Sequence, residues 1–156
     1  KDADTLISTL SDSIQIIIKE SEESGSFQTD SYKYADSVYW ATFGRRQPWP
    51  EHELDTAEAL SNDFIYNYMW GPSEFTALGT LKKYDNHKNL GRIKVPTLFI
   101  AGEYDEARKS TVRYFQSLVP GSEVAIIDDA GHSIMTDNPE QYLKALRTFI
   151  QDAEMK

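Results

Sequence analysis

The second half of this 156-residue chain alternates apolar segments with amphipathic ones, and this alternation constrains the fold more than any other feature. Segment 95–101 is largely apolar, has a proline at its second position and precedes Gly102, as is typical of a buried strand entered through proline. Residues 108–118 have apolar side chains at helical spacing, 124–127 form a second apolar run, and 142–150 return to helical spacing. The order strand, helix, strand, helix predicts parallel strands at the edge of a doubly wound α/β sheet.

The start of the last helix is marked by a capping sequence. Asn138 suits the N-cap, Pro139 suits the first helical position, and Gln141 has a side chain able to reach back to the cap. A helix is therefore predicted from residue 139 onwards.

Before about residue 90 the pattern predicts helices joined by aromatic-rich loops. Apolar spacing predicts one helix over 5–21, broken before Gly25, and a second over 30–42. A third is predicted after Pro50, where three acidic residues favour the positive end of a helix dipole. Two prolines predict a rigid turn over 45–50.

Composition excludes several classes of protein. The 16 Lys and Arg residues against 25 Asp and Glu residues give a net charge of −9, which disfavours nucleic acid and anionic membranes as partners. The absence of cysteine excludes disulfides, thiolate metal sites and a cysteine nucleophile. No apolar run approaches the ~20 residues of a membrane span, and no signal pattern is visible, so a cytoplasmic location is expected.

Two side chains lie where catalytic groups of α/β sheets gather, beyond the carboxyl ends of the strands. Asp105 follows the first predicted strand, and His132 follows the second. A carboxylate that accepts the Nδ1 proton of a histidine leaves Nε2 to take a proton from a nucleophile. Taken singly, Asp105 is equally a helix-capping carboxylate and His132 an ordinary surface histidine, but their joint placement favours an acid–base pair.

The nucleophile expected beside such a pair is missing. A Gly-x-Ser-x-Gly pentapeptide does not occur, and the nearest candidate, Ser73, lacks the second glycine and is interpreted as structural. His52 and His87 lie in polar surroundings and are interpreted as solvated. The spacing of histidines and carboxylates indicates no metal, and no cofactor is expected.

Four motifs, in this order, resemble the C-terminal half of the proline iminopeptidases, α/β-hydrolase serine peptidases related to the tricorn-interacting aminopeptidase. The resemblance runs from about residue 30 to the end of the chain. The motifs are Pro48-Trp-Pro50, Tyr68-Met-Trp-Gly-Pro-Ser-Glu-Phe75, the region from Ile93-Lys-Val-Pro-Thr-Leu98 to Gly102-Glu-Tyr-Asp-Glu106, and Ala130-Gly-His132.

The resemblance implies roles for four residues. Asp105 matches the triad acid and His132 the triad base, while Glu74 and Glu106 match glutamates that hold the α-amino group of the substrate. Paired carboxylates suit that role because a free amine is cationic near neutral pH. The alternative is that both glutamates are helix-start charges. Aromatic residues near Glu74, such as Tyr68 and Trp70, would wall a proline pocket or pack in the core.

The resemblance also implies an organisation. Residues 1–80 are expected to form a helical cap and residues 81–156 the C-terminal part of an α/β-hydrolase core, with the nucleophilic serine in an absent N-terminal half. The expected substrates are short peptides with a free N-terminus, and the expected partner is that missing half. The chain alone is expected to be inactive and to expose an unpaired strand edge. Two alternatives stay open: another hydrolase of this fold (esterase, amidase or lactonase), and a noncatalytic α/β binding module.

Overall fold

The computed structural model describes residues 2–48 and 60–155, and these fall into two compact units. Among these residues, the first unit contains 3–39, 48 and 60–84, and the second contains 40–47 and 85–155 together with Asp2. The predicted helix after Pro50, the end of the predicted turn over 45–50 and His52 lie outside the described residues.

The first unit is built from helices and short turns. Its helices are α1 (Asp2–Ile7), α2 (Asp12–Ser24), α3 (Asp30–Tyr39) and α5 (Asp63–Met69), followed by the 3₁₀ turn η2 (Thr80–Lys83). Gly25 ends α2 in a left-handed conformation with φ of 68°, which glycine adopts without the penalty of a side chain.

The prediction of one helix over 5–21 is wrong, because the segment forms α1 and most of α2 with a break at residues 8–11. The hydroxyls of Ser8 and Thr9 donate hydrogen bonds to the carbonyls of Thr5 and Leu6, which competes with continued helix formation. Ser11 then takes the N-cap position of α2 with an extended backbone.

The core of the first unit joins α2 and α3 to the loop that follows α5. Ile14 and Ile18 of α2 are buried, as are Tyr32 and Tyr39 of α3. The ring of Phe75 lies 5.9 Å from that of Tyr32 and 4.7 Å from that of Tyr39, measured between centroids. These contacts fix the 71–76 loop against the helices.

The second unit is the α/β part of the chain. After the π-helical turn η1 (Trp40–Gly44) it contains the 3₁₀ helix η3 (His87–Arg92), strand β1 (Leu98–Gly102), helix α6 (Lys109–Ser117), strand β2 (Glu123–Ile127), and helices α7 (Ile134–Asp137) and α8 (Pro139–Glu154). The predicted order of strands and helices is thereby confirmed. The helix predicted over 30–42 ends as α3 at Tyr39 and passes into η1, where Gly44 leaves room for the ring of Trp40.

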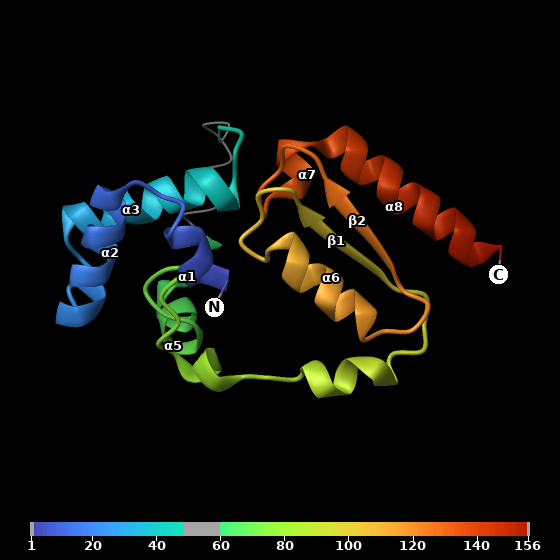
Figure 1. Ribbon diagram of the computed structural model, residues 1–156, viewed down its shortest axis with the longest axis horizontal. Coiled ribbons are helices and arrows are strands. Elements are labelled where there is room, and N and C mark those ends of the chain that lie inside the picture. Colours follow the sequence, from blue (N-terminus) through green and yellow to red (C-terminus); the bar gives the residue numbers. More distant parts are fainter. Residues whose placement is uncertain (1, 49–59, 156) are drawn as a thin grey trace. The chain divides into compact units, whose positions relative to one another are not determined.

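The two strands are parallel, with Leu98 paired to Glu123 and Gly102 paired to Ile127. They lie between α6 and α8 in Figure 1. Within residues 2–48 and 60–155 each strand has one strand neighbour, so one edge of each is without a strand partner there.

The capping sequence of α8 acts largely as predicted. Asn138 is the N-cap and its side chain accepts a hydrogen bond from the backbone N–H of Gln141 at 3.2 Å. The Gln141 side chain does not complete the box at the Asn138 backbone. Its Oε1 accepts from the backbone N–H of Asp128 at 2.7 Å and thereby joins the start of α8 to the loop after β2.

Candidate active site

The loop after β1 presents Asp105, whose carboxylate is held by the backbone of its own loop. Oδ2 accepts a hydrogen bond from the N–H of Gly102 at 3.1 Å, and Oδ1 accepts one from the N–H of Ala107 at 2.8 Å. The residue is 5% exposed. Such bonds fix the orientation of the carboxylate before any partner binds it.

Asp105 and His132 are brought together as the sequence predicts. The Nδ1 atom of His132 lies 3.0 Å from Oδ1 of Asp105. The His132 side chain is 55% exposed, against 5% for its partner. A buried carboxylate that accepts from Nδ1 fixes the tautomer in which Nε2 is the basic nitrogen, and the exposed imidazole can then meet a nucleophile.

The loops that carry the pair approach each other closely. The N–H of Tyr104 donates to the carbonyl of Ala130 at 2.9 Å. A Cβ atom on Gly102 would lie 2.3 Å from that carbonyl oxygen and 2.2 Å from the carbonyl oxygen of Gly131. Only glycine permits this approach without moving the backbone, so Gly102 helps to set the distance between Asp105 and His132.

Glu106 follows Asp105 directly and precedes α6. Its Oε2 atom is buried. Glu106 therefore lies close to the start of α6, with one carboxylate oxygen away from solvent.

In the first unit, Glu74 lies in the loop after α5 and not at a helix start. A buried network holds this loop: the hydroxyl of Tyr32 lies 2.8 Å from Oγ of Ser73 and donates to Oγ1 of Thr76 at 3.0 Å. Thr76 in turn donates to Oε1 of Glu22 at 2.9 Å. Ser73 is buried within this network, where a hydroxyl serves structure.

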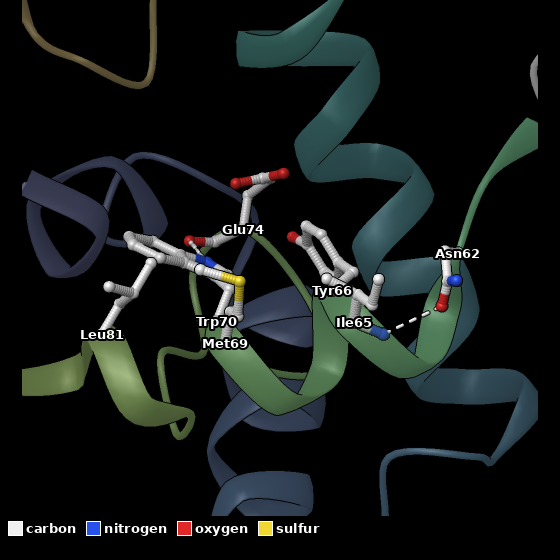
Figure 2. A pocket seen from close by; sticks show the side chains of 7 residues that line it. All are labelled: Asn62, Ile65, Tyr66, Met69, Trp70, Glu74 and Leu81. Atoms are coloured by element: carbon white, nitrogen blue, oxygen red, sulfur yellow. Dashed lines mark hydrogen bonds between the residues drawn. The ribbon is translucent and has the colours of Figure 1, made fainter.

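Glu74 also lines a pocket of about 530 Å³, shown in Figure 2. The phenol of Tyr66 points toward the side of the pocket where Glu74 lies. The indole Nε1–H of Trp70 donates to the backbone carbonyl of Glu74 at 3.1 Å, which fixes the ring beside the glutamate. The pocket is lined by Asn62, Ile65, Tyr66, Met69, Trp70, Glu74 and Leu81.

The two aromatic residues that the sequence suggested as pocket walls near Glu74 differ in their positions. Trp70 lines the pocket, whereas Tyr68 is not among its described lining residues and is 63% exposed. Sequence reasoning missed Tyr66, although its spacing of four residues from Trp70 places both on one side of a helix.

Asp36 of α3 is a second carboxylate in the first unit, and the charge of Glu74 affects its pKa. Burial and, to a smaller extent, the negative charge of Glu74 together raise the pKa of Asp36 to about 6. The sequence carried no signal for this residue, because it belongs to no motif and is 38 positions from Glu74.

The other histidine among the described residues lies beside an aspartate. His87 is paired with Asp85, and its ring lies 6.5 Å from that of Tyr114 between centroids. Within the part of the chain that the structure describes, no group of three or more His, Cys, Asp or Glu side chains is arranged to hold a metal ion. In the same part, no helix combines the length and apolar character needed to cross a membrane.

The fold and the Asp105–His132 pair define the class of protein. Parallel strands with flanking helices, joined to a mostly helical cap, are the C-terminal part of an α/β-hydrolase fold. Two solved structures share this fold. VinJ matches with a TM-score of 0.89 and 27% sequence identity, and the match covers 97% of this chain and 52% of VinJ. A proline iminopeptidase of Mycobacterium smegmatis matches with a TM-score of 0.84 and 24% identity, and the match covers 99% of this chain and 52% of that structure.

Sequence comparison finds curated relatives that are named proline iminopeptidase. The enzyme of that name from Heyndrickxia coagulans is 35% identical over 138 residues, covering 88% of this chain and 48% of the relative. The one from Saccharolobus solfataricus is 32% identical over 151 residues, covering 96% and 49%. No protein-family model matches the chain. The chain is homologous to the proline iminopeptidases, and it spans about half the length of these curated relatives.

Proposed function

We propose that the complete protein is a serine aminopeptidase that releases an N-terminal residue, preferentially proline, from peptides. The observation that carries the proposal is the 3.0 Å contact of His132 with Asp105 in a homologue of proline iminopeptidases. Peptides with a free N-terminus are the proposed substrates, and the part of the enzyme outside this chain is the proposed source of the nucleophile.

In the proposed reaction, a serine hydroxyl from that other part attacks the first peptide carbonyl. His132 Nε2 takes the hydroxyl proton and then gives it to the leaving amine, as the serine oxygen forms the acyl bond and the C–N bond breaks. Water hydrolyses the acyl-enzyme by the same proton transfers and restores the serine. Asp105 keeps its charge and holds the imidazole.

Glu74 and Glu106 are the proposed anchors for the substrate's ammonium group. Glu74 suits this role because it is half-buried and because the other lining residues of its pocket, among those that the structure describes, carry no charge. The apolar walls next to it, including Trp70 and Met69, suit the ring of an N-terminal proline. An ammonium bound there forms charge-assisted hydrogen bonds that a neutral amide cannot form.

The amine anchor is tested with a pair of substrates. The complete protein is expected to cleave an N-terminal proline amide and to leave its N-acetylated form intact. In Glu74→Gln the kcat/KM for the proline amide should fall by about 10- to 100-fold, the size expected for a lost charged hydrogen bond of about 1.5–3 kcal/mol. Equal rates on the two substrates would refute the anchor and favour an esterase or amidase.

The base is tested separately. His132→Ala should remove nearly all turnover, whereas the control His87→Ala should keep it, because His87 contacts Asp85 and His132 contacts Asp105. The 156-residue chain by itself is expected to be inactive. Turnover retained in His132→Ala would contradict its assignment as base.

A further inference from the structure

Asp137, the last residue of α7, binds three backbone N–H groups from two distant parts of the chain. Its Oδ1 accepts from Arg46 at 3.0 Å and from Gln47 at 2.9 Å, and its Oδ2 accepts from Gly131 at 2.9 Å. Gly131 immediately precedes His132. One carboxylate thus ties the histidine loop to the segment after η1.

The backbone of the histidine loop binds the same segment directly. The N–H of His132 donates to the carbonyl of Phe43 at 2.8 Å, and the N–H of Ser133 donates to the carbonyl of Gly44 at 2.7 Å. A Cβ on Gly131 would lie 2.6 Å from the carbonyl oxygen of Phe43, so the two segments are in close contact. The backbone at His132 is therefore held by η1 as well as by the end of β2.

Arg46 extends this connection to the loop of the acid. Its Nε and Nη2 atoms donate to Oδ1 of Asp129 at 3.1 and 2.9 Å, and its guanidinium carbon lies 4.0 Å above the centre of the Tyr104 ring. Tyr104 immediately precedes Asp105. The segment that Asp137 binds therefore contacts both loops of the pair.

We propose that Asp137 is a positioning residue for the acid–base pair: it binds residues 46–47 to Gly131 and thereby sets the distance between the His132 imidazole and Asp105. The effect on catalysis rests on the proposed function, since it matters for turnover only if His132 is the base. The effect on the geometry of the pair does not depend on any activity.

A carboxylate is the side chain that this position requires. Asp137 presents two oxygens to three N–H groups, and Asn has one oxygen and an NH₂ group that would face an N–H donor. Asp137→Asn should therefore release either the Gly131 side or the Arg46 side of the connection. A displacement of about 1 Å at a catalytic group costs about 10²-fold in rate.

The experiment uses the complete protein in four forms: wild type, Asp137→Asn, Asp137→Glu and the control Asp128→Asn. Asp128 is an exposed carboxylate in the loop between β2 and α7, and its Oδ2 accepts a hydrogen bond from the Gln141 side chain at 3.2 Å. We expect kcat to fall by about 10- to 100-fold in Asp137→Asn with KM changed less than about 2-fold. Asp137→Glu should recover part of the loss because it keeps two oxygens, and Asp128→Asn should keep the wild-type kcat.

A proton NMR measurement separates this proposal from the proposed function. The Nδ1 proton of His132, bonded to Asp105, should give a downfield resonance in the wild type that is lost or moved in Asp137→Asn and kept in Asp128→Asn, whether or not the protein cleaves proline amides. An unchanged resonance in Asp137→Asn would overturn the positioning role, including the case in which turnover falls. If the resonance moves as expected but the wild type lacks peptidase activity, the proposed function fails and the positioning role stands.

Discussion

The Tyr32 hydroxyl offers the sharpest test of how the Glu74 loop is held. It is buried in the core of the first unit and hydrogen bonds to Ser73 and Thr76, which lie on either side of Glu74. Tyr32→Phe removes the hydroxyl and keeps the ring, so the contact of that ring with Phe75, 5.9 Å away between centroids, should survive. The substitution thus isolates two buried hydrogen bonds.

Their expected contribution follows from burial. A hydrogen bond between neutral groups contributes about 0.5–1.5 kcal/mol net, and a buried partner left unsatisfied costs about 1–3 kcal/mol. Ser73 and Thr76 are each 3% exposed, so water does not readily replace the lost hydroxyl at either of them. Thr76 keeps its bond to Glu22. We therefore expect Tyr32→Phe to lower the free energy of unfolding by about 2–3 kcal/mol.

Urea unfolding of the complete protein measures this change as a shift of the midpoint at constant slope. Tyr34→Phe is the matched control, because Tyr34 lies on the same helix and is 61% exposed, and its change should stay within about 0.5 kcal/mol. The reasoning is refuted if the two variants are equally stable. It is also refuted if Tyr32→Phe costs less than about 0.5 kcal/mol, since the network would then not hold the loop.

Three further outcomes are expected. Asp36 has a pKa of about 6 when folded, raised from 3.8 by burial and by Glu74, so the folded state binds the extra proton and stability falls as pH rises from about 4 to 6. After discounting for partial exposure this loss is about 1–2 kcal/mol, and urea midpoints at pH 4.5 and 7 should show it in the wild type but not in Asp36→Asn. Gly102→Ala should lower the free energy of unfolding by about 1–3 kcal/mol and should lower kcat, because the new Cβ would lie 2.3 Å from the Ala130 carbonyl oxygen. A variant with the melting temperature and kcat of the wild type would contradict this expectation. Asn138→Ala removes the side-chain cap of α8 and should lower the free energy of unfolding, measured by thermal unfolding, by about 1 kcal/mol. An unchanged free energy of unfolding would show that the cap bond does not stabilise the protein.

The α/β part could be read from the sequence because its signals are local. Each signal lies in the same short segment as the structure that it determines. The examples are the apolar run before Gly102, the helical spacing of residues 109–117 and the cap at Asn138. The prediction of one helix over 5–21 failed because a different local signal interrupts the helix. Apolar periodicity continues through residues 8–11, but the hydroxyls of Ser8 and Thr9 bind nearby carbonyls, and periodicity does not count those bonds.

The pairing of Asp105 with His132 was also predictable, because parallel strands end at the same edge of a sheet. The groups that hold the site were not. Arg46 and Asp137 are 91 positions apart, and Tyr32 and Thr76 are 44 apart, so no spacing rule joins them. A single sequence reveals the residues placed by the strands, while those that fix a loop from another part of the chain appear only with the structure.

The bonds that hold the Asp105–His132 pair in place are of one kind, from backbone N–H groups to carboxylates, and such bonds are hard to detect in a sequence. Asp105 and Asp137 both bind backbone N–H groups at the end of a strand or in a loop: Asp105 binds those of Gly102 and Ala107, and Asp137 binds that of Gly131. Any residue except proline supplies an N–H donor at positions 102, 107 and 131, so the donor side of each bond leaves almost no trace in the residue types. The acceptor side is a lone aspartate, which resembles a solvated charge. A loop can thus be held in place without containing regular structure, provided that carboxylates bind its backbone donors.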